Sequence, residues 1–155
     1  MARLIASLAA ALLLTVPGFA RDIRVIDGDT FDLDGQFIHL WGFDALELDQ
    51  TCIAGGGGEV HIGSIAADTL AALLGGLKEC EVMTVDEAGQ TFAWCTLDDT
   101  TDVAWHMVAS GLAFGLLQVS GGHYIDAEAV AYEGQFGHWR YRCVPPWVWL
   151  ESDEG

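Results

Sequence analysis

The side chains best suited to chemistry are four carboxylates in the first third of the chain, Asp27, Asp29, Asp44 and Glu47. Asp27 and Asp29 bracket a glycine between two short apolar runs, which predicts a tight turn carrying both carboxylates. Clustered carboxylates repel one another unless they are protonated or bind a cation, and hard oxygen ligands select Ca²⁺ or Mg²⁺. Such a cation polarises a phosphate and generates a nucleophilic water.

These carboxylates need elements that bring them together. Short strands are predicted at 21–26, 30–33 and 37–43 from their β-branched and aromatic residues and the turns between them. If the third strand lies beside the first two, Asp29, Asp44 and Glu47 converge on one point. Strict alternation along the third strand puts His39 and Asp44 on opposite faces, unless the strand bends at Gly42.

The rest of the chain predicts one further pair of strands and three helices. Four glycines make 54–58 a flexible loop, and apolar residues at helical spacing predict a helix at 62–74. Strands follow at 79–85 and 91–97, and helices at 102–110 and 124–136. Five short strands interrupted by one helix predict an α+β fold, a small, partly open five-stranded β-barrel of the OB type with the later helices packed outside.

The N-terminus has the composition of a secretory signal peptide at residues 1–20. One base, Arg3, precedes an apolar run at 4–16, and small residues lead to Ala20. A membrane-spanning helix needs about 20 apolar residues, and this run is broken at Pro17. We therefore expect cleavage after Ala20 rather than a membrane anchor, with export to the periplasm or out of the cell. One domain at 21–150 and an acidic, solvated tail at 151–155 should follow.

Charge and cysteine content narrow the function further. Six Lys and Arg against 23 Asp and Glu give a net charge of −17. Such a surface repels phosphate backbones unless bound cations reverse the sign locally.

Four cysteines in an exported chain suggest two disulfides. Cys80 and Cys95 flank the predicted hairpin and can face each other across it, which leaves Cys52 for Cys143.

Several motifs in order resemble the staphylococcal nuclease-like (thermonuclease) family over about residues 24–149. They are Val-Ile-Asp-Gly-Asp-Thr at 25–30, Ile-His-Leu-Trp-Gly-Phe-Asp-Ala-Leu-Glu at 38–47, the turn at 86–91, and Gly-His-Trp and Pro-Pro-Trp near the end. The resemblance implies a five-stranded OB-fold of the staphylococcal nuclease type. It also implies Ca²⁺ binding and hydrolysis of phosphodiester bonds in DNA and RNA.

The resemblance also assigns roles to the carboxylates. Asp29, Asp44 and the Ala45 carbonyl correspond to the calcium ligands, and Asp27 to a supporting carboxylate close to them. Glu47 corresponds to the glutamate that orients or activates the attacking water. This part of the family's site is complete in the chain.

Both catalytic arginines of the family are replaced, the first by His39 and the second by Gln90. Arginine holds phosphoryl oxygens with a bidentate, permanently charged fork. Loss of one such electrostatic donor lowers the rate about 10²–10³-fold. The sequence therefore predicts a catalytically impaired thermonuclease-like domain, a pseudoenzyme that acts as a Ca²⁺-binding interaction module.

Two other functions remain open. The domain is a weakly active Ca²⁺-dependent nuclease on DNA or RNA if His39, or an arginine such as Arg24, Arg140 or Arg142, supplies the missing charge. Alternatively its acidic surface docks on a basic protein partner. A basic side chain beside Asp29 would favour the nuclease.

Overall fold

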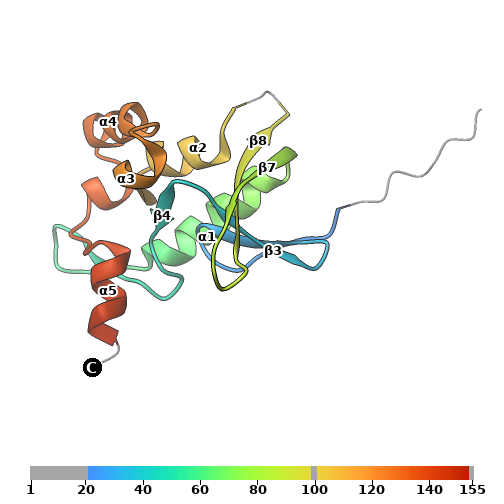
Figure 1. Cartoon of the computed structure of the whole chain (residues 1–155). Coiled ribbons are helices and arrows are strands. Elements are labelled where there is room, and N and C mark those ends of the chain that lie inside the picture. The colour runs from blue at the N-terminus through green and yellow to red at the C-terminus, as the bar shows by residue number, and fades with distance from the viewer. Residues whose placement is uncertain (1–20, 99–100, 154–155) are drawn as a thin grey trace, which may run out of the picture.

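A mixed five-stranded sheet forms one side of the molecule (Figure 1). The computed structural model describes residues 21–98 and 101–153, so the predicted signal peptide lies outside the described residues. β3 and β8 pair in parallel and the other neighbours are antiparallel. The strands lie in the order β1 (Ile23–Val25), β2 (Thr30–Leu33), β3 (Gln36–Leu40), β8 (Thr91–Leu97) and β7 (Leu77–Val85).

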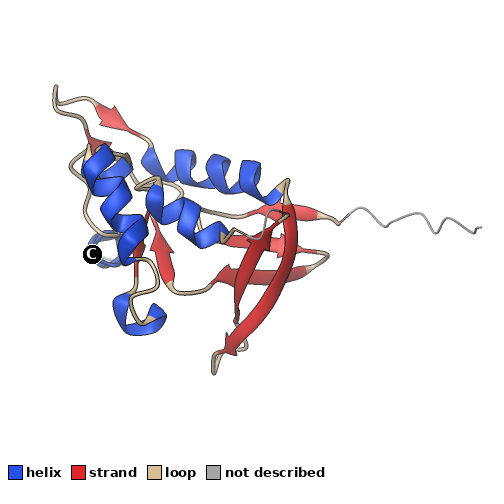
Figure 2. Cartoon of the chain, turned by 90° about the horizontal axis from the view of Figure 1, so that it is seen from above, coloured by secondary structure: helices blue, strands red, loops and turns tan. Residues whose placement is uncertain are grey.

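Helices gather beside this sheet, with α1 running along it (Figure 2). α1 packs against β1 and α2, and α2 packs against β8 and α4. Among the described residues no helix is long and apolar enough to cross a membrane. The helices are α1 (Ile62–Leu74), α2 (Val103–Ala109), α3 (Leu117–Ser120), α4 (Ile125–Gly134), the 3₁₀ turn η1 (Gly137–Trp139) and α5 (Pro146–Asp153).

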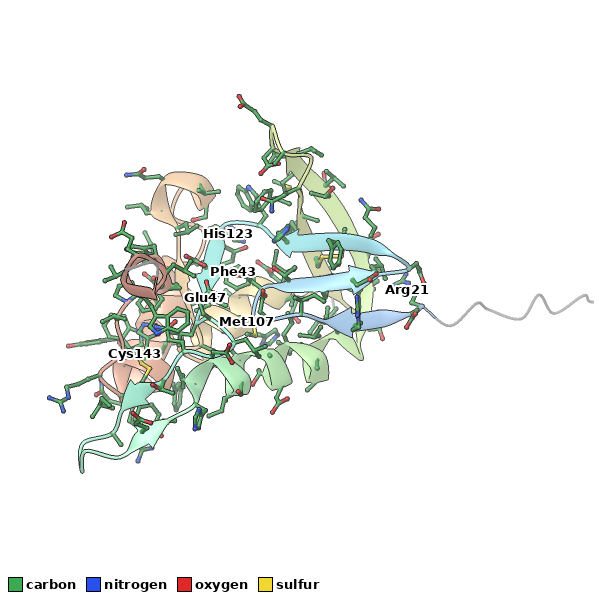
Figure 3. All side chains as sticks on the ribbon, turned by 90° about the horizontal axis from the view of Figure 1, so that it is seen from below. Arg21, Phe43, Glu47, Met107, His123 and Cys143 are labelled. Atoms are coloured by element: carbon green, nitrogen blue, oxygen red, sulfur yellow. A yellow bond between two sulfur atoms is a disulfide. The ribbon has the colours of Figure 1, made fainter. Side chains whose placement is uncertain are left out.

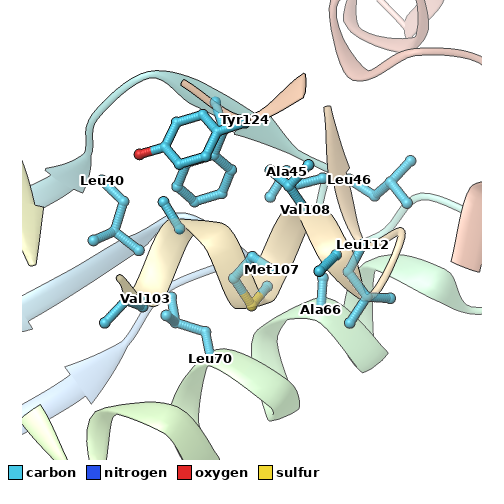
Figure 4. Packing of buried hydrophobic residues seen from close by; sticks show 14 of the residues in the cluster. Leu40, Ala45, Leu46, Ala66, Leu70, Val103, Met107, Val108, Leu112 and Tyr124 are labelled. Atoms are coloured by element: carbon cyan, nitrogen blue, oxygen red, sulfur yellow. The ribbon is translucent and has the colours of Figure 1, made fainter. Parts of the chain in front are cut away.

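The core lies between the sheet and helices α1 and α2 (Figure 4). Ala66 and Leu70 of α1 are four residues apart, so they share one face, and both are fully buried. Met107 and Val108 of α2 are also fully buried. Burying a side chain such as Leu70 stabilises the fold by about 1.5–3 kcal/mol, so this packing fixes the helices against the strands.

A side chain links the two edge strands of the sheet. The Arg21 guanidinium donates hydrogen bonds of 2.8 Å to the Leu77 carbonyl and 2.7 Å to the Lys78 carbonyl. These bonds join the segment before β1 to the start of β7. The sheet is therefore curved enough to bring its two edges together at this end.

The predicted strand at 37–43 is wrong as a single strand. β3 ends at Leu40, and Gly42 adopts a positive φ of 86° that ends extended pairing. The chain then enters β4 (Phe43–Ala45), which leaves the main sheet and pairs with β9 (Ala113–Gly115). This second pair of strands was not predicted, because the partner of β4 lies about 70 residues further along the chain.

Other predicted elements agree with the structure at their bounds or nearly so. The strands at 30–33 and 91–97 and the helix at 62–74 are confirmed at both ends. The predicted glycine loop is the hairpin between β5 (Cys52–Ile53) and β6 (Glu59–Val60). The predicted boundary at residue 150 falls inside α5, so the acidic tail begins as the last turn of a helix rather than as a free end. Residues 154–155 lie outside the described residues.

Both predicted disulfides are present, Cys80–Cys95 and Cys52–Cys143. Cys80 and Cys95 are directly paired across the β7–β8 hairpin. Cys52, at the start of the small hairpin, is joined to the segment before α5 (Figure 3). Such cross-links persist in oxidising compartments, which agrees with the predicted export.

Candidate carboxylate site

The turn before β2 is organised by the carboxylate of Asp27. Its Oδ1 accepts hydrogen bonds from the backbone amides of Asp29 at 3.1 Å and Thr30 at 2.8 Å. A short acidic side chain that bonds backbone amides two and three residues ahead stabilises a tight turn. The predicted turn is therefore confirmed, and Asp27 has a structural role within it.

Asp29 is held at the junction between this turn and β4. Its Oδ2 accepts a 3.0 Å hydrogen bond from the backbone amide of Ala45, and its Oδ1 accepts one of 2.9 Å from the Thr30 hydroxyl. Burial above all, together with the negative charge of Asp27, raises the pKa of Asp29 to about 7 despite the lowering effect of the hydrogen bond from Ala45. Without a bound cation, the ionised form of this buried carboxylate is therefore unfavourable.

Asp44 reaches the same place because the chain bends at Gly42. A Cβ at Gly42 would lie 3.0 Å from a ring carbon of Tyr124 and 3.2 Å from Cβ of Ser120, so only glycine suits both the φ and the space. The bend turns Asp44 toward the cavity that His39 also lines. Burial, followed by the charge of Asp27, raises the pKa of Asp44 to about 6.

Glu47 lies on the loop after β4, and a buried amide fixes that loop. The side chain of Gln50 accepts a 3.0 Å hydrogen bond from the Glu47 backbone amide and donates one of 2.8 Å to the Val144 carbonyl. At Gly63 of α1, an added Cβ would overlap the Glu47 carbonyl, so a glycine is needed for this close approach. Burial, then the charges of neighbouring aspartates, raises the pKa of Glu47.

Gln50 is a positioning residue that the sequence did not reveal. It is fully buried, although a glutamine in an acidic loop is normally solvated. Its partner at Val144 lies 94 residues away, so no local pattern signals the contact. The Cys52–Cys143 disulfide joins the same two segments beside it.

One cavity of about 230 Å³ collects these side chains. Figure 3 shows Glu47 and Phe43, two of its lining residues, at the end of the sheet away from Arg21. None of the described Lys and Arg side chains lines the cavity: for example, Arg24 bonds Asp32 at 3.3 Å. The lining residues are Asp27, Gly28, Asp29, His39, Leu40, Phe43, Asp44, Ala45, Leu46, Glu47, Phe92 and Leu116.

The two residues that replace arginines lie in different places. His39 lines the carboxylate cavity, with its Nδ1 3.0 Å from the Thr30 hydroxyl and its ring 5.2 Å from that of Phe92. Gln90 is exposed on the β7–β8 turn, and its backbone amide donates to the Asp86 carboxylate. It lines an adjoining hollow that includes Thr30 and shares His39 with the cavity. The structure thus brings together every predicted site residue except Gln90.

The donor set suits a hard cation. The raised pKa values of Asp29, Asp44 and Glu47 all come first from burial and then include repulsion among carboxylates, a combination that a bound cation relieves. All the donors are oxygens, as Ca²⁺ and Mg²⁺ prefer. Within residues 21–98 and 101–153, no three His, Cys, Asp or Glu side chains are grouped closely enough to hold an ion by themselves. Backbone oxygen and water would have to complete the coordination.

Comparison with known proteins identifies one curated relative. No family model matches the chain. The succinoglycan biosynthesis protein ExoI of Rhizobium meliloti (strain 1021) is 31% identical over 145 residues, which cover 89% of this chain and 76% of the relative. Identity at this level over most of both chains indicates common descent, and the chain therefore belongs to the family of the succinoglycan biosynthesis protein ExoI.

Proposed function

We propose that the chain is an exported domain of the staphylococcal nuclease type, impaired in phosphodiester hydrolysis, that acts as a Ca²⁺-binding interaction module. The strand order supports the OB-fold part of this proposal. Numbering the main strands along the chain as first to fifth, the order is first, second, third, fifth, fourth, and α1 lies between the third and the fourth. This arrangement is compatible with a five-stranded, partly open OB barrel.

The observation that carries the proposal is a cavity lined by four carboxylates and by no described Lys or Arg. Asp29 and Asp44, with the Ala45 carbonyl, would hold the Ca²⁺ ion, and Asp27 would support them by fixing the turn. A bound Ca²⁺ would supply positive charge for an anionic or hydroxyl-bearing ligand. Glu47, held by Gln50, faces the same space and would orient a water or ligand hydroxyl there.

Hydrolysis should be weak because, among the described residues, no guanidinium group is placed to bind the phosphoryl oxygens in the transition state. Negative charge develops on the phosphoryl oxygens, and a guanidinium stabilises it far better than a neutral side chain. His39 has no forked donor, and Gln90 is neutral and lies outside the cavity. Arg24 is engaged with Asp32, and Arg140 and Arg142 are exposed elsewhere.

The relative and the charge suggest what the module serves. The relative is named for succinoglycan biosynthesis, and a role beside polysaccharide synthesis is compatible with an exported domain that does not depend on cutting nucleic acid. A net charge of −17 favours a basic protein over a nucleic acid as macromolecular partner.

A second candidate function is a weakly active Ca²⁺-dependent nuclease. The observation in its favour is that His39 lines the cavity together with Glu47. A protonated histidine offers one positive N–H to a phosphate oxygen, which is less than an arginine but more than a neutral residue. Nucleic acid would then be the substrate, and Glu47 would act on the attacking water.

Hydrolysis of single-stranded DNA by the mature protein in Ca²⁺ tests these candidates. We expect no cleavage by the native protein and Ca²⁺-dependent cleavage by the His39→Arg, Gln90→Arg double variant, since two arginines would supply the positive charge that the described lining of the cavity lacks. The same double variant with Glu47→Ala added should be inactive. Cleavage by the native protein that needs Ca²⁺ and is abolished by Glu47→Ala would instead establish the second candidate.

A further inference from the structure

The hydroxyl of Thr30 lies between two groups of the carboxylate cavity. Its Oγ1 is 2.9 Å from Oδ1 of Asp29 and 3.0 Å from Nδ1 of His39. Thr30 is only 6% exposed, and it stands directly opposite His39 in the antiparallel pair of β2 and β3. Strand register therefore fixes Thr30 against His39, and the Ala45 amide fixes Asp29 beside them.

The directions of these contacts fix where the ring proton of His39 lies. A threonine hydroxyl has one proton to donate and lone pairs to accept with, and Thr30 donates that proton to Oδ1 of Asp29. Thr30 must therefore accept from His39. Nδ1 of His39 then carries the ring proton, and Nε2, on the other side of the ring, keeps its lone pair.

We propose that Thr30 is a positioning residue that holds His39, a residue that lines the carboxylate cavity, in the Nδ1–H tautomer and so makes Nε2 a proton acceptor. The inference rests on the proposed function only for the identity of the cavity as a ligand site, because the contacts themselves involve no metal. It gives His39 a role opposite to that of the arginine it replaces, which always donates.

The consequence concerns the class of ligand. With His39 neutral, Nε2 and the carboxylates all accept hydrogen bonds, so the cavity is complementary to donors. A ligand hydroxyl or a water can donate to Nε2, whereas a phosphate oxygen cannot. The hydrogen-bonded chain Asp29–Thr30–His39, called the relay below, therefore favours hydroxyl-bearing ligands over phosphodiesters wherever the histidine is neutral. This loss of a donor to the phosphate adds to the loss of the arginine's positive charge.

The tautomer is measurable in long-range ¹H–¹⁵N spectra of the uniformly labelled mature protein, with the His39 signals assigned from a His39→Gln variant. The spectra are recorded in chelator at pH 9, well above the ordinary pKa of a histidine side chain. We expect a protonated Nδ1 and an unprotonated Nε2. Free histidine side chains prefer the opposite tautomer, so this result does not arise by default.

Two variants separate the relay from mere packing. Thr30→Val removes the acceptor and should shift the ratio of Nδ1–H to Nε2–H at least about fivefold toward Nε2–H, the equivalent of one net hydrogen bond. Thr30→Ser keeps the hydroxyl and should keep the native tautomer. Should Thr30→Val not fold, Asp29→Asn serves in its place: its amide donates to Thr30, which then donates to Nδ1 and moves the ring proton to Nε2.

A native protein with Nε2–H, or a tautomer ratio that Thr30→Val and Asp29→Asn both leave unchanged, would overturn the proposal. Because the spectra are recorded without metal or substrate, this result is independent of Ca²⁺ binding and of hydrolysis. If the native protein does not cleave DNA and has the Nδ1–H tautomer, the proposed role of Thr30 is supported. If it cleaves DNA and has the Nε2–H tautomer, the role of Thr30 is contradicted and the nuclease function is supported.

Discussion

The backbone amide of Ala45 donates a 3.0 Å hydrogen bond to Oδ2 of Asp29 and so joins the turn before β2 to the strand that carries Asp44. The bond fixes two carboxylates of the cavity relative to each other through the backbone. Asp29 is buried, and burial disfavours its ionised form more than the hydrogen bond from Ala45 favours it. Burial, and not this bond, therefore makes the ionised, metal-free site unfavourable.

The first prediction concerns the pH dependence of stability in chelator. Because the folded pKa of Asp29, about 7, lies above the ordinary value of 3.8, the folded state binds more protons between these values. Its contribution to the free energy of unfolding is therefore greatest below about pH 4 and is lost as pH rises to about 7. Asp29→Asn should raise the free energy of unfolding by about 2–4 kcal/mol at pH 8 and leave it nearly unchanged at pH 4.

Urea unfolding of both proteins across this pH range measures the difference. Subtracting the free energy of unfolding of the native protein at each pH removes the contributions of other titrating groups. One such group is His138, whose pKa is lowered by burial, so that its contribution to stability changes with pH in the opposite direction. Asp68→Asn, on the exposed side of α1, is the matched control and should give no pH-dependent difference. A difference for Asp29→Asn that is equal at pH 4 and pH 8 would contradict the burial argument.

The second prediction concerns the bend at Gly42. Gly42→Ala should lower the free energy of unfolding by about 2–4 kcal/mol, because it adds contacts with Tyr124 and Ser120 to an unfavourable φ. Gly35→Ala has a similar φ of 91° but open space around it, so it should lose only about 1 kcal/mol. Thermal or urea unfolding compares the two, and equal losses would show that the packing at Gly42 is unimportant.

The third prediction concerns the buried amide of Gln50. Gln50→Met keeps the volume but leaves the Glu47 amide and the Val144 carbonyl without their partner, which should lower the free energy of unfolding by about 2–4 kcal/mol. The loop that carries Glu47 should also exchange its amide hydrogens faster. Gln118→Met, at an exposed position, should change neither property. Unchanged exchange in Gln50→Met would mean that the loop is held by other contacts.

The fourth prediction separates the two disulfides. In the loop-closure picture, a cross-link that spans 91 residues is worth about 4.5 kcal/mol and one that spans 15 residues about 3 kcal/mol. Replacing Cys52 and Cys143 by alanine should therefore destabilise the chain more than replacing Cys80 and Cys95. Only the first pair anchors the Glu47 loop, so only its removal should weaken Ca²⁺ binding. The reverse order in urea unfolding would contradict this account.

Local features of the fold were predictable from the sequence. The turn at Asp27 and Asp29 follows from Asp-Gly-Asp, since the first carboxylate bonds the amides just ahead of it. The helix at 62–74 follows from its apolar spacing and the glycines after it. The resemblance to a known family then indicated which carboxylates meet, and six of the seven predicted site residues line one cavity.

Long-range features were not predictable. The pairing of β4 with β9 and the Gln50–Val144 bond depend on segments far apart in the chain, and no local pattern encodes them. Helix α5 was missed because exposed Trp147, Val148 and Leu150 lie among its residues without a clear apolar face. The sequence predicted that His39 and Asp44 share a face only if the strand bends at Gly42. It could not predict the bend itself, because a glycine permits a positive φ without requiring it.

Calorimetric titration of the metal-free mature protein with Ca²⁺ at pH 8 tests whether the carboxylate cavity binds a metal ion. We expect one bound ion in the native protein, at least tenfold weaker binding in Asp29→Asn and in Asp44→Asn, and native binding in Asp68→Asn. Bound Ca²⁺ should also raise the midpoint of thermal unfolding in the native protein and not in the two site variants. Absence of binding at millimolar Ca²⁺, or binding that Asp29→Asn and Asp44→Asn leave intact, would contradict the proposed metal site.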